Sequence, residues 1–201
     1  MINPSVAHIR DCLRDYQFNH DMDGAELRAA VAAIFRDTDG EPEILFIKRA
    51  DKAGDPWSGQ MAFPGGHIDP QDESTQHAAE RETREEIGLD LTRHGNLLGA
   101  IDLEQPVHRQ SGAKMAVAPF VYALTSEPAR YEPNYEVAEI HWAKVGPMLR
   151  HETVTSIDWD IGSQTITMPG FDVSGRIVWG LTFRMLNRLF SLIHPEFDRL
   201  D

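Results

Sequence analysis

The sequence predicts an α/β fold in a single domain, with a short helix before its core and a strand-and-helix extension after it. Apolar runs of strand length, such as 29–35 and 44–47, alternate with two stretches of helical character, 74–87 and 176–193. No internal repeat and no low-complexity linker divides the 201 residues. We therefore expect one domain over residues 1–201, with its core at about 27–150, an N-terminal helix at about 5–18 and a C-terminal extension at about 151–201.

Composition and charge restrict the classes of protein to which the chain can belong. Apolar residues make up 41% and charged residues 25%, the usual proportions of a globular protein. The formal net charge of -13 opposes binding to nucleic acid or to an anionic membrane surface, so we expect neither partner. Cys12 is the only cysteine, which excludes an intrachain disulfide and a thiolate metal site. With no apolar signal segment and no run of membrane-spanning length, a cytoplasmic location is expected.

The N-terminal and central elements follow from periodicity and turn residues. Val6, Ile9 and Leu13 share one side of the first helix, which Ser5 could cap. The runs 29–35 and 44–47 are apolar nearly throughout, as in strands buried on both faces, and 37–42 supplies the turn of a hairpin. Further strands are predicted at 97–103, 115–124 and 139–142, with a short helical turn at 145–149.

The C-terminal stretch also has regular patterns. Residues 153–168 alternate as in strands, and the turn-rich segment 169–175 connects them to a predicted amphipathic helix at 176–193. The broad apolar stripe of this helix predicts packing against the core in preference to a dimer contact. It consists of Ile177, Val178, Leu181, Met185, Leu186, Leu189, Phe190 and Ile193.

The most distinctive stretch is residues 63–89, where a glycine pair precedes an acidic helix. Gly65 and Gly66 follow Pro64, which predicts a sharp turn that exposes backbone carbonyls to a bound ion. Nothing breaks a helix from about 74 to 87, and Gly88 stands where a left-handed C-terminal cap belongs.

Three glutamates of this helix are expected to project together. Glu82, Glu85 and Glu86 are spaced i, i+3 and i+4, so they share one face. Their mutual repulsion is usually tolerated where a hard cation neutralises it, which indicates a magnesium site. The alternative is a solvated face held by pairs such as Arg81 with Glu85. That alternative does not explain the upstream glycine pair, so we prefer the metal site.

The combined pattern resembles the box of the Nudix hydrolases, G-x5-E-x7-R-E-U-x-E-E-x-G-U. The matching residues are Gly66-x6-Glu73-x7-Arg81-Glu82-Thr83-Arg84-Glu85-Glu86-Ile87-Gly88-Leu89. There are two departures. One extra residue lies before Glu73, as in the coenzyme A pyrophosphatase-like branch, and Thr83 stands at a usually aliphatic position. The resemblance implies an α/β/α sandwich around a mixed sheet, and a diphosphate hydrolase that uses Mg²⁺ or Mn²⁺.

The resemblance also implies roles for individual residues. Glu82, Glu85 and Glu86, with the Gly66 carbonyl, would hold the metal, and Glu85 and Glu86 would be its central ligands. Arg81 would orient the glutamates through charge-assisted hydrogen bonds. The general base would be either a box glutamate or an acid from a later loop, and the predicted acid of that kind is Glu136. Glu73 would reach a metal directly or through water, whereas His67 and His77 are expected to be peripheral.

The substrate side of the site is expected to come from two loops. Arg49 ends the second strand, where it could contact a substrate phosphate or simply be solvated. Trp57 could pack against the core, which we prefer, or stack on a base. Arg109 lies in a basic segment that also contains His108 and Lys114, for which substrate binding and a solvated loop are equally favoured.

Several segments resemble the coenzyme A pyrophosphatase-like branch, although one of its elements is absent. The similar segments are 58–66, 177–182 and Ser111-Gly112 followed by 119–121. The usual serine and Leu-Arg-x-His elements are replaced by residues 49–57. The similar segments predict a coenzyme A-type substrate. The replaced element leaves ADP-ribose or a nucleotide sugar as alternatives. A sensor that binds a nucleotide without hydrolysis is disfavoured, because every acid of the box is present. A homodimer is possible by resemblance.

Overall fold

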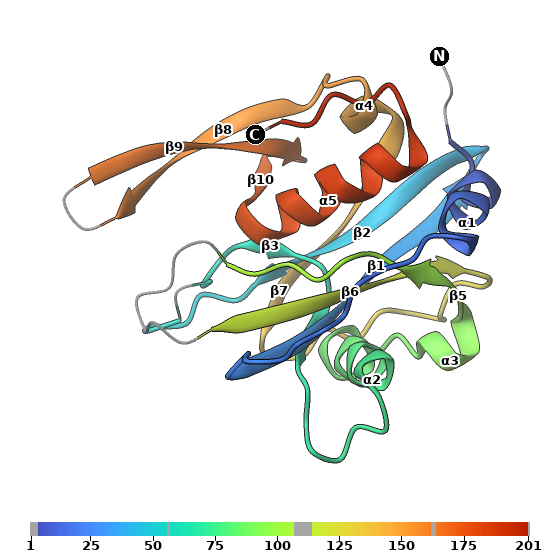
Figure 1. Ribbon diagram of the computed structural model, residues 1–201, viewed down its shortest axis with the longest axis horizontal. Helices are drawn as coiled ribbons and strands as arrows, with labels where there is room; N and C mark the ends of the chain where they lie inside the picture. Colours follow the sequence, from blue (N-terminus) through green and yellow to red (C-terminus); the bar gives the residue numbers. More distant parts are fainter. Residues whose placement is uncertain (1–3, 56, 107–113, 162–163, 201) are drawn as a thin grey trace.

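A mixed β-sheet lies between helices on its two faces in the computed structural model, which describes residues 4–55, 57–106, 114–161 and 164–200 (Figure 1). The predicted α/β class is confirmed. The sheet consists of β1 (Leu27–Thr38), β2 (Glu41–Arg49), β3 (Met61–Ala62), β4 (Gly65–His67), β5 (Gly95–Ala100), β6 (Met115–Leu124) and β7 (Val137–Lys144).

The central strands of the sheet separate at one end, and the candidate site forms there. β1 pairs in parallel with β6 on one side, while on the other it pairs antiparallel with β2 only from Phe35 to Thr38. Toward its start β1 pairs instead with β4, and the end of β2 pairs with β3. The predicted hairpin at 37–42 is confirmed, with Thr38 opposite Glu41. The short strands β3 and β4 thus bring the glycine pair into the middle of the sheet.

The two faces of the sheet carry separate hydrophobic cores, as expected for strands that are apolar throughout. Along β1, Ala29, Ala33 and Phe35 belong to one core, and Ala30, Ala32 and Ile34 belong to the other. This alternation follows from the two-residue period of a strand. All six side chains are at most 3% exposed, so the centre of β1 is buried from both sides.

Different helices cover the two cores. The first core contains buried side chains of α1 (Val6–Arg14), α4 (Val145–Leu149) and α5 (Gly180–Ile193). The second contains side chains of α2 (Thr75–Ile87) and α3 (Leu91–His94). α1 is shorter than the predicted 5–18, although the Ser5 cap is confirmed, since its hydroxyl accepts a hydrogen bond from the His8 amide at 3.2 Å. The short α3, capped by Asp90, was not predicted.

The C-terminal extension forms a second, antiparallel sheet of β8 (Val154–Ile161), β9 (Gln164–Val173) and β10 (Arg176–Trp179). Figure 1 shows that its β8–β9 hairpin projects from the body of the molecule. The prediction of a helix from residue 176 is wrong at its start. Ile177 and Val178 are in β10, paired with Asp172 and Phe171, and the helix begins at Gly180. The preferred role of the helix is confirmed, because seven of its residues are buried.

Candidate active site

The acidic helix α2 forms where the sequence predicts it and is capped at both ends. The Ser74 hydroxyl accepts a hydrogen bond from the His77 amide at 3.1 Å, and Gly88 ends the helix with a φ of 71°. The helix packs on β1 and β4 through its buried face. Thr83 lies on that face, fully buried, and its hydroxyl donates to the Ala79 carbonyl at 2.7 Å. This bond explains how a threonine is accommodated at a usually aliphatic position.

The glycine pair serves close packing, and the prediction of a sharp turn at these residues is wrong. The backbone bends at Pro64, and Gly65 and Gly66 already belong to β4. Gly65 has a φ of 147°, and a Cβ there would lie 2.3 Å from the Ala30 carbonyl oxygen. A Cβ on Gly66 would lie 2.6 Å from Cδ of Glu82. Glycine is needed because β1 and the Glu82 carboxylate approach the backbone so closely.

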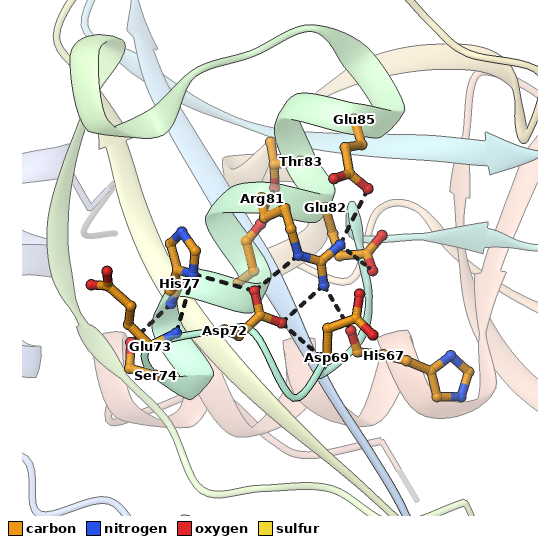
Figure 2. Close-up of polar contacts among 11 residues, drawn as sticks. His67, Asp69, Asp72, Glu73, Ser74, His77, Arg81, Glu82, Thr83 and Glu85 are labelled. Carbon is orange, nitrogen blue, oxygen red and sulfur yellow. Dashed lines mark hydrogen bonds and ion pairs between the residues drawn. The ribbon is translucent and has the colours of Figure 1, made fainter.

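Arg81 connects two box glutamates to Asp72 and to the backbone of His67 (Figure 2). Its Nε and Nη2 donate to the two carboxylate oxygens of Asp72, at 2.9 and 3.0 Å. Nη2 also donates to the His67 carbonyl at 3.0 Å, and Nη1 donates to Glu82 at 3.0 Å and to Glu85 at 3.2 Å. These contacts are of the kind that we expect from a residue that orients the glutamates.

Asp72, which the sequence analysis missed, forms the two-pronged pair with Arg81. Its side chain is 1% exposed, and Arg81 is the main cause of its pKa lying below the ordinary value. Glu73 is exposed, and Figure 2 shows its carboxylate directed away from Arg81. The spacing contained a usable signal: Asp72 follows Gly66 after five residues, as the box acid of the family does, whereas Glu73 keeps only the spacing to Arg81. The expectation that Glu73 reaches a metal directly or through water does not fit this arrangement.

Glu86 is a buried carboxyl next to other acids. It is 3% exposed, and its Oε2 accepts a hydrogen bond from the Gly65 amide at 2.8 Å. Burial raises its pKa to about 8; the Gly65 amide and Arg49 oppose this, and the charges of Glu82 and Glu136 add to it. Burial also raises the pKa of Glu82. Arg81 lowers this pKa, whereas the charges of Glu85 and Glu136 raise it further.

The loop before β7, which contains Glu136, reaches the region of Glu82 and Glu86. The prediction of Glu136 as the general base requires this. The charge of Glu136 acts on Glu82 and Glu86. The Glu136 backbone carbonyl accepts a hydrogen bond from the Ala50 amide at 2.8 Å. Its carboxylate lies 3.9 Å from Nζ of Lys52. The strand that ends at Arg49 and the loop that contains Glu136 therefore meet beside Glu82 and Glu86. Glu85, by contrast, is about half exposed at the outer edge.

Of the three residues predicted to bind the substrate, the structure describes the contacts of two. Arg49 donates from Nη2 to Asp55 at 2.7 Å. Its charge acts on Glu86, so it lies within electrostatic range of the acidic cluster formed by Glu82, Glu86 and Glu136. Trp57 is partly buried, and its amide donates to Asp55 at 2.9 Å. Its two predicted roles stay open. Arg109 lies outside the described residues.

The oxygen atoms available as metal ligands at this site are of the type that a hard divalent cation prefers. The described part of the chain holds no set of three Asp, Glu, His or Cys side chains gathered closely enough to bind a metal ion. Arg81 instead holds Glu82 and Glu85, as described above. The available ligands are nonetheless all oxygens, namely carboxylates and the backbone of Gly66, which lies against Glu82. A cation would also offset the burial, and the smaller effect of the Glu82 and Glu136 charges, that raise the pKa of Glu86.

Comparison with known proteins places the chain in a family. Residues 26–159 match the model of the NUDIX domain. An uncharacterised protein of Schizosaccharomyces pombe, C14C4.10c, is 33% identical over 162 residues, which are 78% of this chain and 47% of that protein. The mitochondrial coenzyme A diphosphatase NUDT8 of Mus musculus is 30% identical over 79% of this chain and 74% of its own length. NUDT8 of Homo sapiens is 29% identical over 83% and 70%.

The chain therefore belongs to the Nudix hydrolase family. The two mammalian relatives confirm its resemblance to the coenzyme A pyrophosphatase-like branch. The chain spans about half the length of the Schizosaccharomyces pombe relative.

The fold itself is shared with solved structures of the family. The crystal structure of a MutT/nudix family protein from Enterococcus faecalis has a TM-score of 0.52 over 94% of this chain and 67% of that one, at 16% identity. Because the identity is low, this likeness supports the α/β sandwich and nothing finer. Within the described ranges, no helix is both long and apolar enough to cross a membrane.

Proposed function

We propose that the chain is a metal-dependent pyrophosphohydrolase that cleaves the diphosphate linkage of a nucleoside diphosphate derivative. The observation that carries this proposal is the buried Glu86 carboxyl, which is 3% exposed and lies within electrostatic range of Glu82 and Glu136. A site that concentrates negative charge is suited to a divalent cation and, through it, to a phosphate-bearing substrate.

Each residue then has a defined task in the proposed reaction. Glu82, Glu85, Glu86 and the Gly66 carbonyl would hold Mg²⁺ or Mn²⁺, which, when bound, neutralises the diphosphate oxygens. Arg81 keeps Glu82 and Glu85 in place through its Nη1. Arg49 binds a nonbridging phosphate oxygen at the edge of the cluster.

Glu136 is the proposed general base. A water molecule attacks one phosphorus, its proton passes to the Glu136 carboxylate, and the bond from phosphorus to the bridging oxygen breaks. Two phosphate-containing products result. Glu136 is suited to this task because it faces Glu82 and Glu86 from a separate loop and is 37% exposed, which leaves it open to water.

A coenzyme A-type substrate is the favoured choice, and its support is the resemblance to two proteins named coenzyme A diphosphatase. ADP-ribose or a nucleotide sugar is the alternative, because residues 49–57 replace an element of the coenzyme A branch. A nucleotide-binding sensor without hydrolysis is disfavoured by the complete set of box acids. The cytoplasmic location and the possible homodimer also stay proposals, and both mammalian relatives are named mitochondrial.

The decisive experiment is a substrate panel with and without Mg²⁺. Coenzyme A, ADP-ribose, nucleotide sugars and dinucleoside polyphosphates are each incubated with the protein, and the products are separated and identified. We expect Mg²⁺-dependent release of two phosphate-containing products from one class. Glu86→Gln should lower kcat/KM at least about 100-fold, because several kcal/mol of charge stabilisation depends on the ion.

The controls separate the metal assignment from the hydrolase assignment. Glu73→Gln alters an exposed acid directed away from Arg81 and should keep near-normal activity. Full activity in both Glu85→Gln and Glu86→Gln would overturn the metal assignment. Nucleotide binding without any turnover across the panel would favour the sensor instead.

A further inference from the structure

The loop that joins β2 to β3 is organised around Asp55. Oδ1 of Asp55 accepts a hydrogen bond from the Trp57 amide at 2.9 Å, and Oδ2 accepts one from Nη2 of Arg49 at 2.7 Å. The Asp55 carbonyl also accepts a bond from the Ser58 amide at 3.1 Å. The Asp55 side chain is only 13% exposed. One carboxylate therefore connects the turn of the loop to the last side chain of β2.

The electrostatics show that this contact is made to an ionised carboxylate. Burial alone would raise the pKa of Asp55, but the hydrogen bonds from Arg49 and the Trp57 amide outweigh it, and the pKa lies below its ordinary value. Asp55 is therefore ionised at neutral pH, and its bond to Arg49 is charge-assisted.

Part of the Arg49 side chain stays open to solvent. Its Nε is buried and has no hydrogen-bond partner among the described residues, although the side chain as a whole is 29% exposed. Its charge acts on Glu86, so the guanidinium lies within electrostatic range of the acidic cluster. A phosphate oxygen can approach Arg49 from its exposed side, where the guanidinium offers further N–H donors.

We propose that Asp55 is a positioning residue for the substrate: it holds Arg49 by Nη2 so that the exposed side of the guanidinium meets a nonbridging oxygen of the diphosphate. This inference rests on the proposed diphosphate substrate. Asp55 uses only one nitrogen of the guanidinium fork, so the remaining donors stay available to an anion. The loop closure around Asp55 fixes the carboxylate, which in turn fixes the arginine before the substrate arrives.

Binding of inorganic pyrophosphate with Mg²⁺, measured by calorimetry, tests the inference without requiring turnover. Asp55→Asn keeps the shape of the side chain but removes its charge, and Arg49→Lys keeps the charge but removes the guanidinium fork. Each should weaken pyrophosphate binding about tenfold, the effect expected for one charge-assisted hydrogen bond. The double variant should bind pyrophosphate with the same affinity as the single variant that binds it more weakly, because Asp55 acts through Arg49.

Controls and a second variant keep the result interpretable. Glu152→Gln removes the partner of Arg150 in an exposed pair outside the acidic cluster, so its affinity should match the wild type. If Asp55→Asn does not fold, Asp55→Glu replaces it, and partial recovery of affinity is expected from a carboxylate of greater reach. Unchanged binding in Asp55→Asn, or additive losses in the double variant, would overturn the proposal. Tighter binding would show that Asp55 competes with phosphate for Arg49, which also overturns it.

A kinetic measurement separates this inference from the proposed function. With whichever substrate the panel identifies, Asp55→Asn should raise KM about tenfold and change kcat little, since uniform binding is lost. A loss confined to kcat would contradict a positioning role. If the wild type hydrolyses nothing, the hydrolase proposal fails, while the pyrophosphate titration still decides the role of Asp55.

Discussion

Replacing Asp72 by asparagine should destabilise the protein markedly, although Asp72 is not among the residues that the sequence pattern predicts. The substitution removes the charge that receives Nε and Nη2 of Arg81 at 2.9 and 3.0 Å. Breaking a buried ion pair costs about 3–5 kcal/mol, and hydrogen bonds to charged groups contribute about 1.5–3 kcal/mol each. Because Arg81 keeps its contacts with Glu82 and Glu85, we take the lower end, about 3 kcal/mol.

The size of this effect can be checked by urea unfolding and by thermal melting. For a chain of this length, about 3 kcal/mol corresponds to a fall in Tm of roughly 6–12 °C. Glu73→Gln is the matched control, because this neighbouring acid is exposed and should change the free energy of unfolding by less than about 0.5 kcal/mol. Equal stability of the Asp72 variant and the wild type, or a larger loss in the Glu73 variant, would refute the assignment of Asp72 as the partner of Arg81.

Two further predictions concern stability outside the acidic cluster. Arg184→Met combined with Arg188→Met leaves the Glu104 carboxylate, 4% exposed, without its two ion-pair partners, and should cost about 3 kcal/mol in urea unfolding; a loss below about 1 kcal/mol would contradict this. Burial lowers the pKa of His20, against its bond to the Ile101 carbonyl, so the unfolded chain takes up a proton at about pH 6.5 and the folded chain only at lower pH. The free energy of unfolding should therefore fall as pH drops below about 6.5, and His20→Asn should reduce this fall in urea titrations between pH 5 and 8; identical slopes in both proteins would contradict it.

Much of the candidate site could be predicted because its residues are close in sequence. A helix places Glu82, Glu85 and Glu86 on one face by geometry alone, and the helix ends follow from Ser74 and Gly88. Such local rules need no knowledge of the rest of the fold. They could not show that Glu86 is buried while Glu85 is exposed, because that difference depends on which side of α2 packs on β1 and β4.

The sequence-based predictions were wrong where a local pattern is compatible with two structures. Ile177 and Val178 continue the apolar stripe of a helix, yet the backbone from Arg176 to Trp179 pairs with β9, and only that pairing decides between strand and helix. Gly65 and Gly66 fit a turn as well as they fit a close approach. The neighbouring strand β1 decides for the second, since a Cβ on Gly65 would collide with the Ala30 carbonyl.

The sequence by itself determined the family, the acidic helix and its caps, and the order of most strands, because periodicity and spacing along the chain encode these features. Only the tertiary structure decided which distant groups meet. It brings Arg49 and Glu136 to Glu82 and Glu86, and it makes Asp72, not Glu73, the partner of Arg81. The physical reason is that burial and charge coupling depend on distances across the sheet, which no spacing along the chain specifies.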